Sequence, residues 1–121
     1  MRFCLVVALA LLIGGCSEQG AAQDANAPVK IQTSQMYVTV RNDSGAPLNE
    51  VSLAIVPVGR QTVYNKFIGR LENSETRNVM LGDFFGRDGT PFSLRVVKPQ
   101  SVELKGKDVR GKDYSTEVAW R

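Results

Sequence analysis

Few side chains in this sequence could do chemistry, because the 121 residues include no histidine and only two cysteines. Histidine is the commonest general base and the commonest metal ligand in proteins. Its absence excludes Ser-His-Asp and Cys-His catalysis and the usual zinc sites. Serine-lysine or aspartate-pair catalysis would need a spacing that this sequence does not distinguish from the composition of its turns. The sequence therefore predicts a protein that is not an enzyme and that takes no cofactor.

Two aspartates in one loop, Asp83 and Asp88, come nearest to a metal site. Calcium takes about six to eight oxygen ligands, and two carboxylates supply too few. Asp88 precedes Gly89, a pair typical of turns, and we expect Phe84 and Phe85 to fill the core. The loop is therefore interpreted as a turn, and no metal ligands are assigned.

A cysteine ends the apolar segment at the start of the chain. Arg2 supplies a positive charge, residues 3–13 form an apolar run, and the run closes with Ile13-Gly14-Gly15-Cys16. The run is too short for a membrane-spanning helix, since at about 1.5 Å per residue it covers about half of a ~30 Å hydrocarbon core. The segment resembles the signal and lipobox of bacterial lipoproteins. Ordinary secretory cleavage is the alternative interpretation.

This resemblance implies that residues 1–15 are removed and that the thiol of Cys16 carries the lipid. Two or more acyl chains give stable membrane anchoring. Ser17, where some lipoproteins have aspartate, resembles the pattern sent on to the outer membrane. We therefore expect a lipid anchor on the periplasmic face of a bacterial outer membrane. Cys4 leaves with the signal, so the folded domain would contain no disulfide.

The rest of the chain divides into a linker and one domain. Residues 16–35 are predicted to be the lipidated cysteine and a flexible tether, because almost no large apolar side chain is available to offset the entropy of ordering. In residues 36–121 the apolar positions alternate with a period of two, and turn-forming residues recur about every eight to twelve positions. This pattern is typical of short antiparallel strands. The domain is therefore predicted to be all-β.

Seven strands are expected in this domain. They cover residues 37–41, 51–56, 62–71, 77–81, 92–96, 102–104 and 114–120. In the last of them Val118 is expected to face inward and Glu117 outward. Seven strands in about 86 residues favour two packed sheets, with a small closed barrel as the structural alternative.

Two turns resemble those of small bacterial immunoglobulin-like domains. Residues 40–48 read VRNDSGAPL and residues 68–75 read IGRLENSE, similar to the patterns V-x-N-x-S-G-x-x-L and I-x-x-L-x-x-G-E of that family. The resemblance covers most of residues 36–120 and implies a seven-stranded immunoglobulin-like antiparallel sandwich. It implies no activity, since such sandwiches host many functions. Asn42-Asp43-Ser44 in the first turn also matches a glycosylation sequon, which we interpret as part of the turn.

Basic residues gather near the carboxyl end of the chain. Six lie between positions 95 and 112, and we single out four as a candidate patch for an anionic partner: Lys105, Lys107, Arg110 and Lys112. The alternative is a solvated strand face whose lysines discourage edge pairing. A formal net charge of +3 is a small excess for a nucleic-acid-binding surface, so no nucleic-acid partner is expected.

These observations lead to one expectation about function and one alternative. We expect a membrane-anchored periplasmic lipoprotein that acts as a non-enzymatic binding or envelope-assembly module. Its partners would be the membrane, through the lipid on Cys16, and a protein of the envelope. The alternative is a binding domain for an anionic small ligand or envelope polymer, held through the basic strands.

Overall fold

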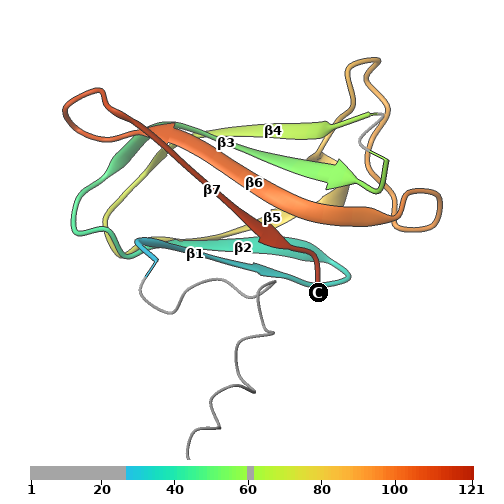
Figure 1. Ribbon diagram of the computed structural model, residues 1–121, viewed down its shortest axis with the longest axis horizontal. Coiled ribbons are helices and arrows are strands. Elements are labelled where there is room, and N and C mark those ends of the chain that lie inside the picture. Colours follow the sequence, from blue (N-terminus) through green and yellow to red (C-terminus); the bar gives the residue numbers. More distant parts are fainter. Residues whose placement is uncertain (1–26, 60–61) are drawn as a thin grey trace, which may run out of the picture.

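Alternating apolar residues form two antiparallel sheets in the computed structural model, which describes residues 27–59 and 62–121. In these residues a three-stranded sheet has the order β1-β2-β5 and a four-stranded sheet the order β4-β3-β6-β7. Figure 1 shows the two sheets as separate layers. Their strands are β1 (Val29–Thr33), β2 (Tyr37–Asn42), β3 (Leu48–Pro57), β4 (Tyr64–Leu71), β5 (Thr76–Met80), β6 (Pro99–Lys107) and β7 (Asp113–Ala119).

The core lies between the two layers and takes one face of each strand. Along β2, Val38 and Val40 are buried, and along β3 the same holds for Val51, Leu53 and Ile55. A strand sends successive side chains to opposite faces, so a period of two buries one complete row. Five further positions predicted to face inward are buried as well: Val79, Leu81, Val102, Leu104 and Val118. The all-β class and the two antiparallel sheets are therefore as the sequence predicted.

The predicted domain boundary at residue 36 is wrong, because β1 lies inside the segment expected to be a tether. Val29 and Ile31 are buried, and β1 pairs with β2 in the register Val29↔Asn42 and Ile31↔Val40. Two apolar residues in a polar segment contribute too little free energy to order it alone, but pairing with a neighbouring strand adds hydrogen bonds and burial in a core. The remainder of the predicted linker, residues 16–26, and the signal, residues 1–15, lie outside the described residues.

The strand predicted over residues 92–96 is also wrong. Phe92 is buried, where its ring meets Tyr64 edge-on at 5.3 Å, but Val96 is 81% exposed. The backbone turns here, since the N–H groups of Val96 and Val97 both donate to the carbonyl of Ser93. The apolar alternation in this segment has one core residue and no strand partner. The described residues still contain seven strands, because β1, which was not predicted, replaces the strand predicted over residues 92–96 in the count.

One buried polar side chain, Asn42, connects the two sheets. It lies at the end of β2, fully excluded from solvent, and its Nδ2 donates to the carbonyl of Leu71 in β4 at 3.1 Å and to that of Ala46 at 2.9 Å. Its Oδ1 accepts the N–H of Ser44 at 3.0 Å. A buried amide is tolerated when its donors and acceptors are all engaged, as they are here. The sequon asparagine is therefore a structural residue, buried within the first turn.

We predict that Asn42→Asp destabilises the protein by about 2–4 kcal/mol at neutral pH, because a buried carboxylate would face two carbonyl oxygens that now accept hydrogen bonds. The matched change Asn73→Asp should cost less than about 0.5 kcal/mol, since the exposed Asn73 uses its Oδ1 only to accept the N–H of Gly45. Urea unfolding of the purified protein measures both. Equal losses would show that Asn42 does not connect the sheets.

Candidate functional site

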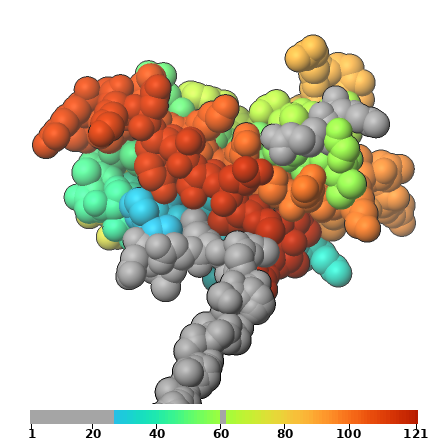
Figure 2. Space-filling model, viewed as in Figure 1, coloured from blue at the N-terminus to red at the C-terminus, as the bar shows by residue number. Residues whose placement is uncertain are grey.

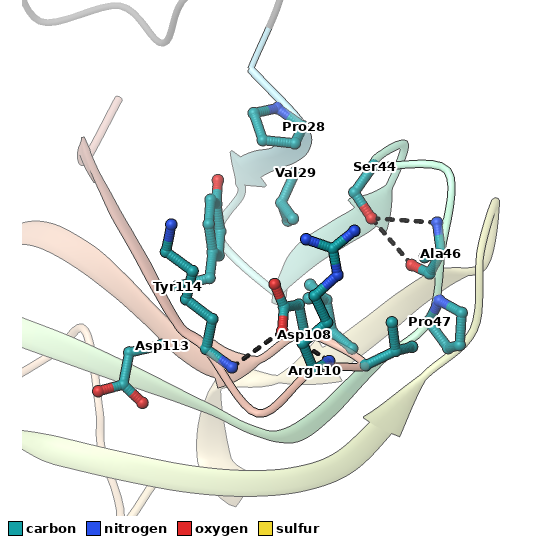
Figure 3. A pocket seen from close by; sticks show the side chains of 12 residues that line it. Pro28, Val29, Ser44, Ala46, Pro47, Asp108, Arg110, Asp113 and Tyr114 are labelled. Atoms are coloured by element: carbon teal, nitrogen blue, oxygen red, sulfur yellow. Dashed lines mark hydrogen bonds between the residues drawn. The ribbon is translucent and has the colours of Figure 1, made fainter.

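A cleft of about 420 Å³ opens at one end of the two layers. Three segments meet there: the start of β1, the loop between β2 and β3, and the turn between β6 and β7. Figure 3 shows Pro28 and Val29 on one side, Ser44 and Ala46 on another, and Arg110 between them. The residues that line the cleft are Pro28, Val29, Ser44, Ala46, Pro47, Leu48, Asp108, Val109, Arg110, Lys112, Asp113 and Tyr114.

The turn between β6 and β7 is fixed by the carboxylate of Asp108. Its Oδ1 accepts the backbone N–H groups of Arg110 and Lys112, each at 2.9 Å, and its own N–H donates to the carbonyl of Lys112. Gly111 takes a positive φ of 83°, a backbone conformation that glycine adopts without strain. The N–H of Lys112, then that of Arg110 and the charges of both residues, hold the pKa of Asp108 below its ordinary value of 3.8.

This turn leaves two cationic side chains at the cleft. Among the described residues neither Arg110 nor Lys112 forms an ion pair within 4 Å. Lys107 and Asp113 pair with each other at 2.7 Å, so together they add no net charge to the cleft. Asp108 offsets one of the two cations at the cleft. The cleft therefore keeps about one net positive charge beside apolar walls, a combination suited to an anionic group with an apolar part.

The opposite wall depends on the turn that Asn42 holds. The Oγ of Ser44 lies 2.7 Å from the Oδ1 of Asn42 and 2.8 Å from the carbonyl oxygen of Ala46. Gly45 follows with a φ of 95° and donates its N–H to Asn73. These contacts fix Pro47 against the cleft, so this wall is set by the same side chain that joins the sheets.

The structure separates the four residues of the predicted basic patch. Arg110 and Lys112 come together in the cleft. Lys107 is instead engaged by Asp113, whose hydrogen bond and negative charge raise the pKa of Lys107. Lys105 lies on the outer face of the four-stranded sheet, in register with Ser115 of β7. A shallow depression there is lined by Glu103, Lys105, Ser115, Thr116 and Glu117.

Sequence reasoning missed the walls of the cleft. Pro28 and Val29 stood in the predicted tether, and Tyr114 was counted only as a strand residue. The short alternation of Val29 and Ile31 could have indicated β1. The start of that strand forms part of the cleft wall. Segments distant in sequence meet here only through the sheet pairing, which a single sequence does not specify.

The aspartate loop behaves as a turn in the structure. Asp88 Oδ1 accepts the N–H of Thr90 at 2.9 Å, and Asp83 lies in a short 3-10 helix, Leu81–Asp83. Phe84 is buried as expected, but Phe85 is half exposed, where its backbone pairs with Asn65. In residues 27–59 and 62–121, no three cysteine, aspartate or glutamate side chains are grouped so that they would hold a metal ion.

The predicted anchor, Cys16, lies outside the described residues. Within the described ranges, no helix has the length and apolar character needed to cross a membrane. No family model, curated protein or solved structure matches this chain. Any statement about function therefore depends on the residues themselves.

We predict that Asp108 titrates below pH 3.8 in the folded protein. Because folding favours its charged form, the stabilising contribution is present above the unfolded pKa and is lost as the pH falls through the lower folded pKa. The amide protons of Arg110 and Lys112 should shift with the same midpoint in an NMR titration. In Asp108→Ala these two amides should exchange with solvent about tenfold faster. A midpoint above 3.8 would contradict the turn geometry.

Proposed function

We propose that this protein is a lipid-anchored binding module on the periplasmic face of a bacterial outer membrane, with an immunoglobulin-like domain and no enzymatic activity. The anchor would be the lipid on Cys16, and the cleft would bind an anionic group of a small ligand or of an envelope polymer. The observation that carries the binding proposal is the pair Arg110 and Lys112, held at an apolar cleft with no ion-pair partner within residues 27–59 and 62–121.

The strand pairing supports the immunoglobulin-like part of this proposal. If β1, β2, β3, β4, β5, β6 and β7 are lettered A, B, C, C′, E, F and G, the sheets have the orders A-B-E and C′-C-F-G. Immunoglobulin-like sandwiches keep strands A, B and E in one sheet and C, F and G in the other. Loops cluster at the two ends of such sandwiches and form the binding site in variable domains. The segments that line the cleft meet at one end of the two layers (Figure 1).

The chemistry of the cleft supports binding rather than catalysis. A general base works best with a pKa near the operating pH, whereas hydrogen bonds depress the pKa of Asp108. Asp113, the other cleft carboxylate, also has a depressed pKa, caused by its hydrogen bond from Lys107. Neither group is suited to remove a proton near neutral pH. The two cations and the apolar walls instead offer charge complementarity and contact area to a ligand.

The position of β1 supports a membrane-proximal cleft. Because the domain begins at Pro28 rather than near residue 36, only about twelve residues separate Cys16 from β1. Even when fully extended, a chain of that length spans at most about 40 Å. Pro28, where this tether joins the domain, is itself part of the cleft wall. An anchored domain would thus carry its cleft near the lipid surface and near polymers attached to it.

The first test concerns the anchor. Cys16→Ser should abolish lipid attachment and signal removal, because the hydroxyl does not replace the acylated thiol. The expected product is a heavier, unprocessed chain that incorporates no labelled palmitate. The serine variant of Cys4 serves as the control and should be processed normally. Labelling of the Cys16→Ser protein at the normal level would rule out this anchor.

The second test concerns the cleft. Arg110→Gln/Lys112→Gln should weaken binding of a carboxylated polysaccharide such as alginate about tenfold, while the melting temperature stays nearly unchanged. Raising the salt from about 0.05 to about 0.5 M shortens the Debye length from ~14 to ~4 Å and should weaken wild-type binding similarly. NMR titrations with alginate and with inorganic phosphate measure both effects and distinguish polymer from small-anion binding.

The matched control is Arg95→Gln/Lys98→Gln, which removes the same charge just before β6, at the other end of that strand from the cleft. This variant should bind like the wild type. If both double variants lose affinity equally, binding depends on net charge alone and the cleft is not the site.

A further inference from the structure

One edge of the four-stranded sheet, formed by β7, is left open by every other strand of the described residues. β7 pairs with β6 on one side, in an unbroken register from Lys107↔Asp113 to Ser101↔Ala119. Hydrogen bonds close both ends of this pairing: the N–H of Asp108 donates to Lys112, and that of Trp120 donates to Gln100. Figure 1 shows β7 at the margin of its layer.

The hydrogen bonds at both ends fix which residues of β7 face outward. In an antiparallel pair, residues alternate between those bonded to the partner strand and those directed away from it. Positions 112 and 120 bond to the β6 side, so the even positions between them do the same. The odd positions therefore direct their N–H and C=O groups to the open side; they are Asp113, Ser115, Glu117 and Ala119.

The other edge of this sheet is covered. At β4 the N–H and C=O of Asn65 both bond to Phe85, and the guanidinium of Arg77 donates to the carbonyls of Ile68 and Arg70 at 3.3 and 3.2 Å. Glu75 holds that guanidinium in place. No comparable bond reaches the four outward residues of β7 from any other element among the described residues. β7 also contains no proline, lysine or bulge, which commonly protect edge strands.

The two charged side chains that β7 itself places on its outer face are acidic, and Lys105 and Lys107 lie beside them on β6. Asp113, Ser115 and Glu117 lie on the same face, and all three are exposed. Asp113 engages Lys107 through one oxygen, and Glu117 engages Ser101 through one oxygen, so each carboxylate keeps a second oxygen for another donor. Figure 2 shows the atoms of this part of the chain, in red, at the molecular surface.

Charge decides which strand fits this edge. If a second copy of β7 paired antiparallel with the first, centred on Ser115, the carboxylates of Asp113 and Glu117 would face each other, and like charges directly opposite are destabilising. The segment 17–26 of this chain carries Glu18 and Asp24 and no basic residue. Neither occupant complements the edge, whereas lysine or arginine opposite the two carboxylates does.

We propose that β7 is a docking edge for an extended segment of another protein, bound by strand addition, with basic side chains at two positions four residues apart. Backbone hydrogen bonds supply affinity in this mode, and the alternate side chains supply specificity. The two basic residues pair with Asp113 and Glu117, and a small polar residue between them lies opposite Ser115. Asp113 lies where this edge meets the cleft, whereas Ser115 and Glu117 lie beyond the cleft lining.

The test is an NMR titration of the purified full-length protein with the peptide Thr-Lys-Val-Thr-Val-Lys-Thr. Binding should shift the amides of Asp113, Ser115, Glu117 and Ala119 and slow their exchange with solvent. Two control peptides should fail: one with glutamate for both lysines, and one N-methylated at the residues that face β7. No shift at millimolar peptide, or equal binding by all three peptides, overturns the proposal.

Two variants separate strand addition from other modes of contact. Ser115→Pro removes one outward N–H but no bond to β6, so the protein should stay folded and lose about tenfold in peptide affinity. Asp113→Asn/Glu117→Gln should remove the preference for lysine over glutamate peptides without changing the fold. Unchanged affinity in Ser115→Pro, or dimers joined through β7 in sedimentation, would refute the inference.

Discussion

The buried amide of Asn42 is the interaction on which most of this structure depends. It ends β2, bonds across the core to β4, and closes the loop that leads into β3. Its main chain is engaged as well, since its N–H donates to Glu75 and its carbonyl accepts from Ser74. One side chain thus fixes the distance between the two sheets at one end. Without a disulfide in the described residues, such a fully satisfied polar contact supplies the directional constraint that apolar packing lacks.

The cleft is a consequence of that constraint and of a second one. Asn42 fixes the loop that carries Ser44 and Pro47, and Asp108 fixes the turn that carries Arg110 and Lys112. Both are short polar side chains that bond to backbone N–H groups nearby, a usual role for asparagine and aspartate in turns. The candidate binding residues of the cleft therefore lie on loops whose backbones are held by hydrogen bonds.

The sequence predicted the parts of the fold that follow from local periodicity. The alternation of Val51, Leu53 and Ile55 reflects one buried strand face, and that of Val102 and Leu104 reflects another. Prediction from periodicity failed where the pattern did not match the tertiary contacts. β1 is short and polar on its outer face, and residues 92–96 alternate without a partner strand. The burial of Asn42 and the division of the basic residues depend on contacts between distant segments. Those contacts follow from sheet register, which composition and spacing do not specify.

The asymmetry between the two edges of the four-stranded sheet limits the size of any assembly built through it. Head-to-tail growth of a sheet from chain to chain requires two open edges in each molecule. The guanidinium of Arg77 occupies the outward carbonyls of β4, so that edge offers no continuation. A sheet with one closed edge has a valency of one. Even at high local concentrations of the protein, pairing through this sheet would end at a single added strand instead of propagating into a fibre.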